Sequence, residues 1–136
     1  MNILFFITPK SEVAYIYEYY TIRQALEKME YHKYSSIPII NKDGKYIGTI
    51  TEGDLLWALK NDFSLDFKSI EEVSIMDVQR KMDNSPVSIN ANIEDLVSKS
   101  MNQNFVPVID DQDIFIGIIK RRDIIGYCYD KLKNIN

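Results

Sequence analysis

The residues of this chain that are best suited to chemistry lie in two short polar sequences, each of which follows an apolar stretch. The first contains Thr51 and Asp54. Their spacing is typical of a capping box, in which a Thr hydroxyl and an acidic side chain accept backbone N–H groups at the start of a helix. A carboxylate at this position can also accept both hydroxyl protons of a cis-diol. Capping and ligand binding are therefore compatible here.

The second polar sequence is Lys120, Arg121, Arg122 and Asp123. Three cations at a helix N-terminus are unfavourable by about 0.3–1 kcal/mol each, because the helix dipole is positive there. A bound phosphate reverses that effect, since it can take backbone N–H groups and a guanidinium fork from Arg121 or Arg122. In the alternative interpretation these side chains extend into water or pair with three nearby acids, Asp110, Asp111 and Asp113.

The two polar sequences belong to a duplicated unit. Residues 34–56 match residues 103–125 without a gap, so that Gly48 pairs with Gly117 and Asp54 with Asp123. Lys120 replaces Thr51 in the second copy, and a lysine side chain cannot cap a helix N-terminus. An internal repeat of this kind determines the architecture of the chain.

Each copy predicts the same five elements. Thr21 and Asn92 are good helix N-caps, and the residues after each follow the helical period with one apolar face. A short apolar strand containing proline follows each helix, then a turn, a returning strand and a second helix. The first turn carries Asp43 and Gly44, a hairpin signal, whereas the second is polar and lacks glycine.

This strand, helix, strand, strand, helix pattern resembles the cystathionine-β-synthase (CBS) domain, whose tandem pairs form the nucleotide-sensing Bateman module. The resemblance extends from Thr8 to about Asp130 and rests on the glycine of the returning strand and the Thr-x-x-Asp sequence after it. It implies an α+β fold of two pseudo-symmetric βαββα CBS repeats packed into one Bateman module. We expect repeats at residues 8–60 and 76–130, joined by residues 61–75, where Ser69 begins a connecting helix.

The resemblance also implies a ligand site. The aspartate of the motif typically holds the ribose hydroxyls of an adenosine ligand, while the threonine reaches ribose or phosphate. Adenine sits between two segments, here Val13, Ala14, Tyr15 and Ile16 on one side and Ser36, Ile37 and Pro38 on the other. Only exposed edges of Ile16 and Ile37 would touch the base. The spacing of Tyr15, Tyr17 and Tyr19 fits one face of a strand, with Tyr15 as a candidate contact.

We therefore predict an adenine-nucleotide sensor (AMP, ADP or ATP) that signals its ligand state to a protein effector. One alternative is a cyclic di-AMP receptor, because the sequence looks similar to small stand-alone bacterial CBS proteins that bind this ligand. The other is a ligand-free structural dimerisation module. The resemblance implies a homodimer through the helices after Asp54 and Asp123, where Trp57 and Leu59 are candidate exposed apolar residues. Because Lys120 replaces the threonine of the motif in the second copy, we expect the first site to be the better formed of the two.

Composition narrows the possible functions. The chain has 136 residues, a formal net charge of -4 and a single cysteine, Cys128, which excludes an intrachain disulfide and a cysteine metal cluster. The net charge argues against broad nucleic-acid binding. The apolar stretch from Ile3 to Ile7 is too short for a signal core or a membrane span, so we expect a cytoplasmic protein. No catalytic, cofactor or metal-binding motif is present, and the lone His32 is no catalytic signal.

Overall fold

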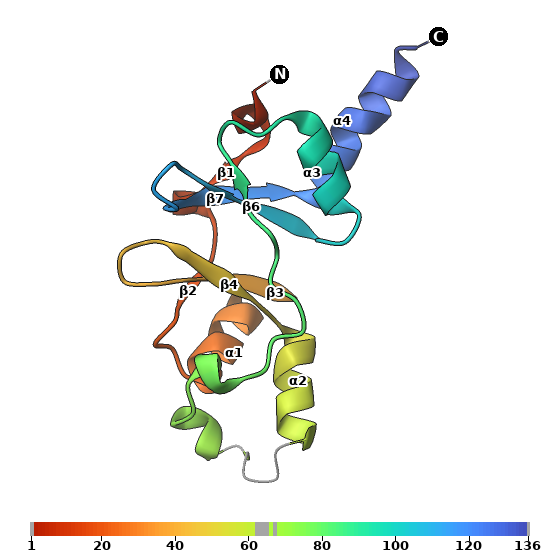
Figure 1. Cartoon of the computed structure of the whole chain (residues 1–136). Helices are drawn as coiled ribbons and strands as arrows, with labels where there is room; N and C mark the ends of the chain where they lie inside the picture. The colour runs from red at the N-terminus through yellow and green to blue at the C-terminus, as the bar shows by residue number, and fades with distance from the viewer. Residues whose placement is uncertain (1, 62–65, 67, 136) are drawn as a thin grey trace. The chain divides into compact units, whose positions relative to one another are not determined.

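The computed structural model describes residues 2–61, 66 and 68–135 (Figure 1). The chain forms two compact units, one comprising Ala14–Asp83 and the other Met1–Val13 together with Asn84–Asn136. The N-terminal segment thus packs with the second repeat. The repeat boundaries given above stay a prediction, since they describe sequence repeats and not packing.

The first repeat has a three-stranded sheet in the order β2-β3-β4. Strand β2 (Ile16–Tyr17) runs parallel to β3 (Ser36–Ile40), which pairs antiparallel with β4 (Tyr46–Thr51). Helices α1 (Ile22–His32) and α2 (Glu52–Asn61) lie on the same side of this sheet (Figure 1). The predicted connecting helix is a single 3-10 turn, Ser69–Glu71, followed by a second one, Ile75–Asp77.

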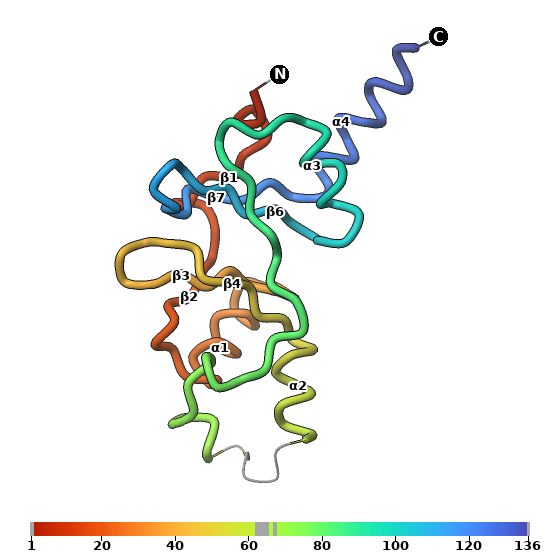
Figure 2. Tube along the Cα trace, in the orientation of Figure 1, coloured from red at the N-terminus to blue at the C-terminus, as the bar shows by residue number. Residues whose placement is uncertain are grey.

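The second repeat has a four-stranded sheet in the order β1-β7-β6-β5. Its own elements are β5 (Val87–Ser88), α3 (Ile93–Ser100), β6 (Phe105–Ile109), β7 (Phe115–Lys120) and α4 (Arg121–Lys133). The fourth strand, β1 (Thr8–Pro9), comes from the N-terminal segment and pairs antiparallel with β7 (Figure 2). Short 3-10 turns at Ile3–Phe6 and Lys10–Glu12 flank β1. Ile3 is fully buried in the core of this unit, so the apolar N-terminal stretch contributes to its packing, although Leu4 and Phe5 are exposed.

Both repeats follow the predicted βαββα order, which confirms the α+β class. The N-caps are also confirmed, because Thr21 and Asn92 each form a complete capping box. The hairpin turns differ in the residue that takes the left-handed conformation. Gly44 does so in the first with φ 85°, and Asp113 does so in the second with φ 65°. An aspartate tolerates this conformation better than most residues, so the second turn forms without glycine.

Two expectations about exposed aromatic and apolar residues are wrong. Strand β2 ends at Tyr17, so the tyrosines do not line one strand face. The chain turns instead, and the rings of Tyr17 and Tyr19 stack with their centroids 5.1 Å apart, in contact with Tyr15 and Tyr20. Leu59 is half-buried and packs on the core of the first repeat, because it lies on the inner face of α2.

Candidate functional site

The predicted capping box is present where β4 ends and α2 begins. The N–H of Thr51 donates to Asp54 Oδ2 at 3.0 Å, and the N–H of Asp54 donates to Thr51 Oγ1 at 3.0 Å. The box fixes the rotamer of the carboxylate in the first turn of α2, where the helix dipole favours a negative charge. Asp54 is only 4% exposed, an unusual position for an aspartate, and this burial requires further hydrogen bonds.

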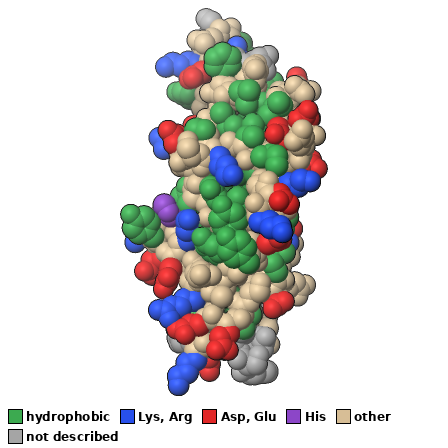
Figure 3. Space-filling model, turned by 90° about the vertical axis from the view of Figure 1, so that its left-hand side faces the viewer, with side chains coloured by type: hydrophobic (Ala, Val, Ile, Leu, Met, Phe, Trp, Pro, Cys, Tyr) green, Lys and Arg blue, Asp and Glu red, His purple; other side chains and the backbone are tan. Residues whose placement is uncertain are grey.

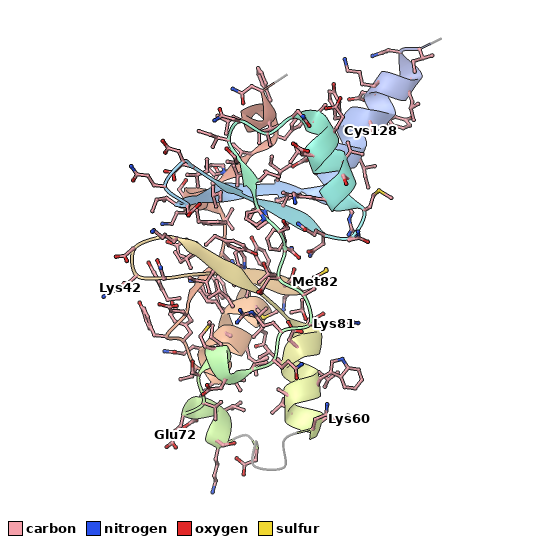
Figure 4. The ribbon with its side chains drawn as sticks, in the orientation of Figure 1. Lys42, Lys60, Glu72, Lys81, Met82 and Cys128 are labelled. Atoms are coloured by element: carbon pink, nitrogen blue, oxygen red, sulfur yellow. The ribbon has the colours of Figure 1, made fainter. Side chains whose placement is uncertain are left out.

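One of those bonds comes from a distant part of the chain. The backbone N–H of Lys81 donates to Asp54 Oδ1 at 3.0 Å. Lys81 lies beside the N-terminal end of α2 (Figure 4). Sequence reasoning missed this contact, because a main-chain donor leaves no signature in residue type. Each carboxylate oxygen keeps a lone pair that could accept a ligand hydroxyl, although Asp54 is buried in this structure.

A second carboxylate ties residues 80–83 to β4. Asp83 Oδ1 accepts the N–H of Thr49 at 2.9 Å and Arg80 Nε at 2.7 Å. Gly48 makes this approach possible, since a Cβ at that position would lie 2.4 Å from Asp83 Oδ1. The glycine of the repeat therefore admits the 80–83 segment to the strand.

The equivalent glycine admits a different neighbour in the second repeat. A Cβ on Gly117 would lie 2.3 Å from the carbonyl oxygen of Thr8 in β1, and its φ of +156° is rarely adopted by other residues. The two repeats thus use equivalent positions differently. In the first, β4 accommodates the side chain of Asp83, and in the second, β7 pairs with strand β1.

Next to Asp83, the hydroxyl of Tyr46 lies 2.6 Å from Thr49 Oγ1. Burial raises the pKa of Tyr46, and the nearby Asp83 carboxylate raises it further, while the Thr49 hydrogen bond acts in the opposite direction. The phenol is therefore neutral across the physiological pH range.

The two segments expected to hold the base are brought together in the first repeat. Strand β2 lies parallel to β3 with Ile16 opposite Ile39, so the first segment enters the sheet beside the strand that contains the second. Ala14, Ser36 and Pro38 are buried and Tyr15 is half-buried. The exposed edges expected for Ile16 and Ile37 are absent, because both side chains are fully buried in the core cluster. Val13 belongs to the other compact unit.

In the second repeat Arg121 has a structural partner. Its Nε donates to the carbonyl oxygens of Ser100 at 2.8 Å and Gln103 at 3.0 Å, at the C-terminal end of α3. These carbonyls lie where a helix has unsatisfied acceptors. Asp110, one of the acids expected to pair with the arginines, instead accepts two N–H groups of its own turn.

The remaining polar residues of this sequence lie at the surface. Lys120 occupies the N-cap position of α4 without a side-chain hydrogen bond, as its chemistry predicts. Lys120, Arg122 and Asp123 are all exposed. The two equivalent aspartates thus differ, since Asp54 is buried and accepts the Lys81 N–H, whereas Asp123 is exposed.

Two further features are absent from the part of the chain that the structure describes. Within it, no group of three His, Cys, Asp or Glu side chains could hold a metal ion, and no helix is long and apolar enough to cross a membrane. On the face drawn in Figure 3, acidic, basic and hydrophobic side chains are all present at the surface.

One protein-family model matches two successive parts of this chain. The model of the CBS domain matches residues 6–61 and 71–130. An uncharacterized protein of Methanocaldococcus jannaschii, MJ1225, is 25% identical over 137 residues, covering 93% of this chain and 49% of the relative. L-aspartate semialdehyde sulfurtransferase of the same organism is 31% identical over 104 residues, covering 76% of this chain and 19% of the enzyme. The chain therefore spans about half the length of the first relative and about a fifth of the second.

Solved structures share the fold over nearly the whole chain. CbpB in complex with c-di-AMP superposes with a TM-score of 0.84 at 24% identity, covering 99% of this chain and 89% of CbpB. A CBS domain protein from Streptococcus pneumoniae TIGR4 has a TM-score of 0.83 at 25% identity, with coverage of 95% and 87%. CBSX2 in complex with AMP has a TM-score of 0.74 at 20% identity, with coverage of 95% and 96%. The chain belongs to the CBS-domain family and contains two copies of the domain.

Proposed function

We propose that this protein is a regulatory module that binds an adenine nucleotide at its first repeat and catalyses no reaction. The observation that carries this proposal is the Asp54 carboxylate, which Thr51 holds in a fixed orientation at the start of α2. A carboxylate held in this way is preorganised to accept the two hydroxyls of a ribose. The family adds support, because CBSX2 was solved with AMP and CbpB with c-di-AMP.

The same carboxylate suggests how binding is signalled. Asp54 is only 4% exposed and already accepts the N–H of Lys81, so ribose hydroxyls that bind the carboxylate compete with the segment of residues 80–83, to which Lys81 belongs. A bound ligand therefore favours a state in which this segment has moved. Residues 80–83 are the last of one compact unit and continue along the chain into the other, so their rearrangement can be passed on to a protein effector.

Cyclic di-AMP is a second candidate ligand. The similarity in fold to CbpB over 99% of this chain favours it. Arg122 is the arginine best placed to meet a phosphate, because its side chain is exposed whereas Arg121 Nε already binds two carbonyls. Dependence of binding on Arg122 would therefore favour the cyclic dinucleotide or a polyphosphate over AMP.

We also propose a cytoplasmic homodimer. Helix α2 exposes Leu56 and Trp57, and α4 exposes Ile125, Tyr129 and Leu132 at the spacing of one helix face. Apolar stripes of this kind are typical of association surfaces. Sedimentation velocity of the wild type and of Trp57→Ser tests this, and a wild-type monomer at high concentration would contradict it. A dimer that binds no nucleotide would support the structural-module alternative.

Calorimetric titration with AMP, ATP and cyclic di-AMP tests the nucleotide proposal. Wild type is compared with Asp54→Asn and with a matched control, Asp77→Asn, whose side chain is exposed in the same compact unit. We expect binding to wild type and the control and its loss in Asp54→Asn. Equal binding by all three proteins, or no heat with any ligand, contradicts the proposed site.

A further inference from the structure

A buried glutamine occupies main-chain hydrogen-bonding groups of the second repeat. Gln103 is 6% exposed. Its Oε1 accepts the N–H of Ser85 at 2.8 Å, and its Nε2 donates to the carbonyl oxygen of the same residue at 3.0 Å. The side-chain amide thus forms a two-point pair with the main chain of one residue. Nε2 also lies 3.3 Å from the carbonyl oxygen of Phe105, which Asn84 Nδ2 contacts at 3.1 Å.

The strand register identifies what these groups correspond to in the first repeat. Ile16 lies opposite Ile39 in one sheet, and Val87 lies opposite Val108 in the other. Counting back from Ile16 and Val87 makes Ser85 the counterpart of Ala14. The same alignment of the repeats makes Phe105 the counterpart of Ser36 and Gln103 that of Tyr34. Gln103 therefore binds the groups that, in the first repeat, belong to the base side of the proposed site.

The side-chain amide of Gln103 offers the same pair of hydrogen-bonding groups as one edge of adenine. Adenine presents an amino donor next to a ring-nitrogen acceptor. A carboxamide likewise presents one donor next to one acceptor. The main-chain N–H and C=O of Ser85 can pair with the Gln103 amide or with an adenine edge, but not with both at once. Tyr34 has no amide, so it cannot compete with a base in the same way.

We infer that Gln103 takes the place of the base in the second repeat and limits the chain to one nucleotide, bound at the first repeat. This inference rests on the proposed function. The ribose end of the second repeat differs as well, because Lys120 takes the place of Thr51 and Asp123 is exposed. The difference at the base end is a separate one, because there the second repeat supplies its own hydrogen-bonding partner for the main chain.

The test is the number of AMP molecules bound per chain, measured by calorimetry on wild type, Gln103→Ala and a matched control, Gln112→Ala, whose side chain is exposed in a turn. We expect one AMP for wild type and the control and two for Gln103→Ala. Two AMP molecules on wild type, or one on Gln103→Ala, overturns the inference while the proposed function stands. No AMP on wild type but one on Gln103→Ala overturns the proposed site and supports the role of Gln103. No binding by either protein overturns both.

Photo-crosslinking of wild type with azido-AMP tests the inference without the variant, in case Gln103→Ala does not fold. We expect labelled peptides from residues 14–16 and 34–38 only. Labelling of residues 84–87 or 103–107 in the wild type would overturn the inference, because the amide would then not exclude the base. An absence of labelling on both segments counts against the proposed function as well.

Discussion

Replacing Asp54 with Asn measures how much the buried carboxylate contributes to folding apart from any ligand. The side chain keeps its shape, but one oxygen becomes an NH₂ donor and the charge is lost. In the native structure the two oxygens accept the N–H groups of Thr51 and Lys81, each at 3.0 Å. Asparagine can satisfy only one of these donors and points its own donor at the other.

The magnitude follows from those contacts. A hydrogen bond to a charged group contributes about 1.5–3 kcal/mol to stability. The interaction of the carboxylate with the α2 dipole adds about 0.3–1 kcal/mol. We therefore expect Asp54→Asn to lower the free energy of unfolding by about 2–4 kcal/mol. Thr51→Val, which removes only the acceptor for the Asp54 N–H, should lower it by about 0.5–2 kcal/mol.

Urea denaturation followed by far-UV circular dichroism gives both values in the absence of nucleotide. The reasoning requires Asp54→Asn to cost clearly more than Thr51→Val, since only Asp54 also holds Lys81. It is refuted if the two variants lose the same free energy of unfolding, because the carboxylate would then act only as a helix cap. The double variant should lose less than the sum of the two, since both residues belong to one capping box.

Three further predictions concern the same two units. Gly117→Ala should lower the free energy of unfolding by about 2–6 kcal/mol, because the added Cβ meets the main chain of β1 and the φ is unfavourable. Gly48→Ala should lower it by about 1–3 kcal/mol, because its Cβ meets only the flexible side chain of Asp83. Urea midpoints in the reverse order would contradict this. Arg121→Ala should lose about 1.5–3 kcal/mol of stability without ligand, and the exposed Arg122→Ala almost none; equal thermal midpoints for the two variants would be inconsistent with the carbonyl contacts. Burial raises the pKa of Tyr46 above its ordinary 10.0, so its contribution to stability is complete below pH 10 and is lost as pH rises further; Tyr46→Phe should reduce this alkaline loss in denaturation curves, and an unchanged pH profile would disprove it.

The amino-acid sequence determined the architecture and the local chemistry of the first site. The ungapped match between residues 34–56 and 103–125 predicted the duplicated βαββα order, since a repeat of apolar periodicity and turn residues builds the same elements twice. The capping box of Thr51 and Asp54 was also predictable, because it depends on contacts three residues apart.

The tertiary structure decided which groups those residues actually meet. The Lys81 N–H on Asp54 and the N-terminal strand β1 on β7 join residues far apart in the chain through main-chain groups, which residue type does not encode. Residue type also did not reveal the roles of Arg121 and Gln103, because a guanidinium or an amide fits a ligand and a backbone carbonyl equally well. Only the position of the carbonyls at the end of α3 and around Ser85 assigns them to the protein itself.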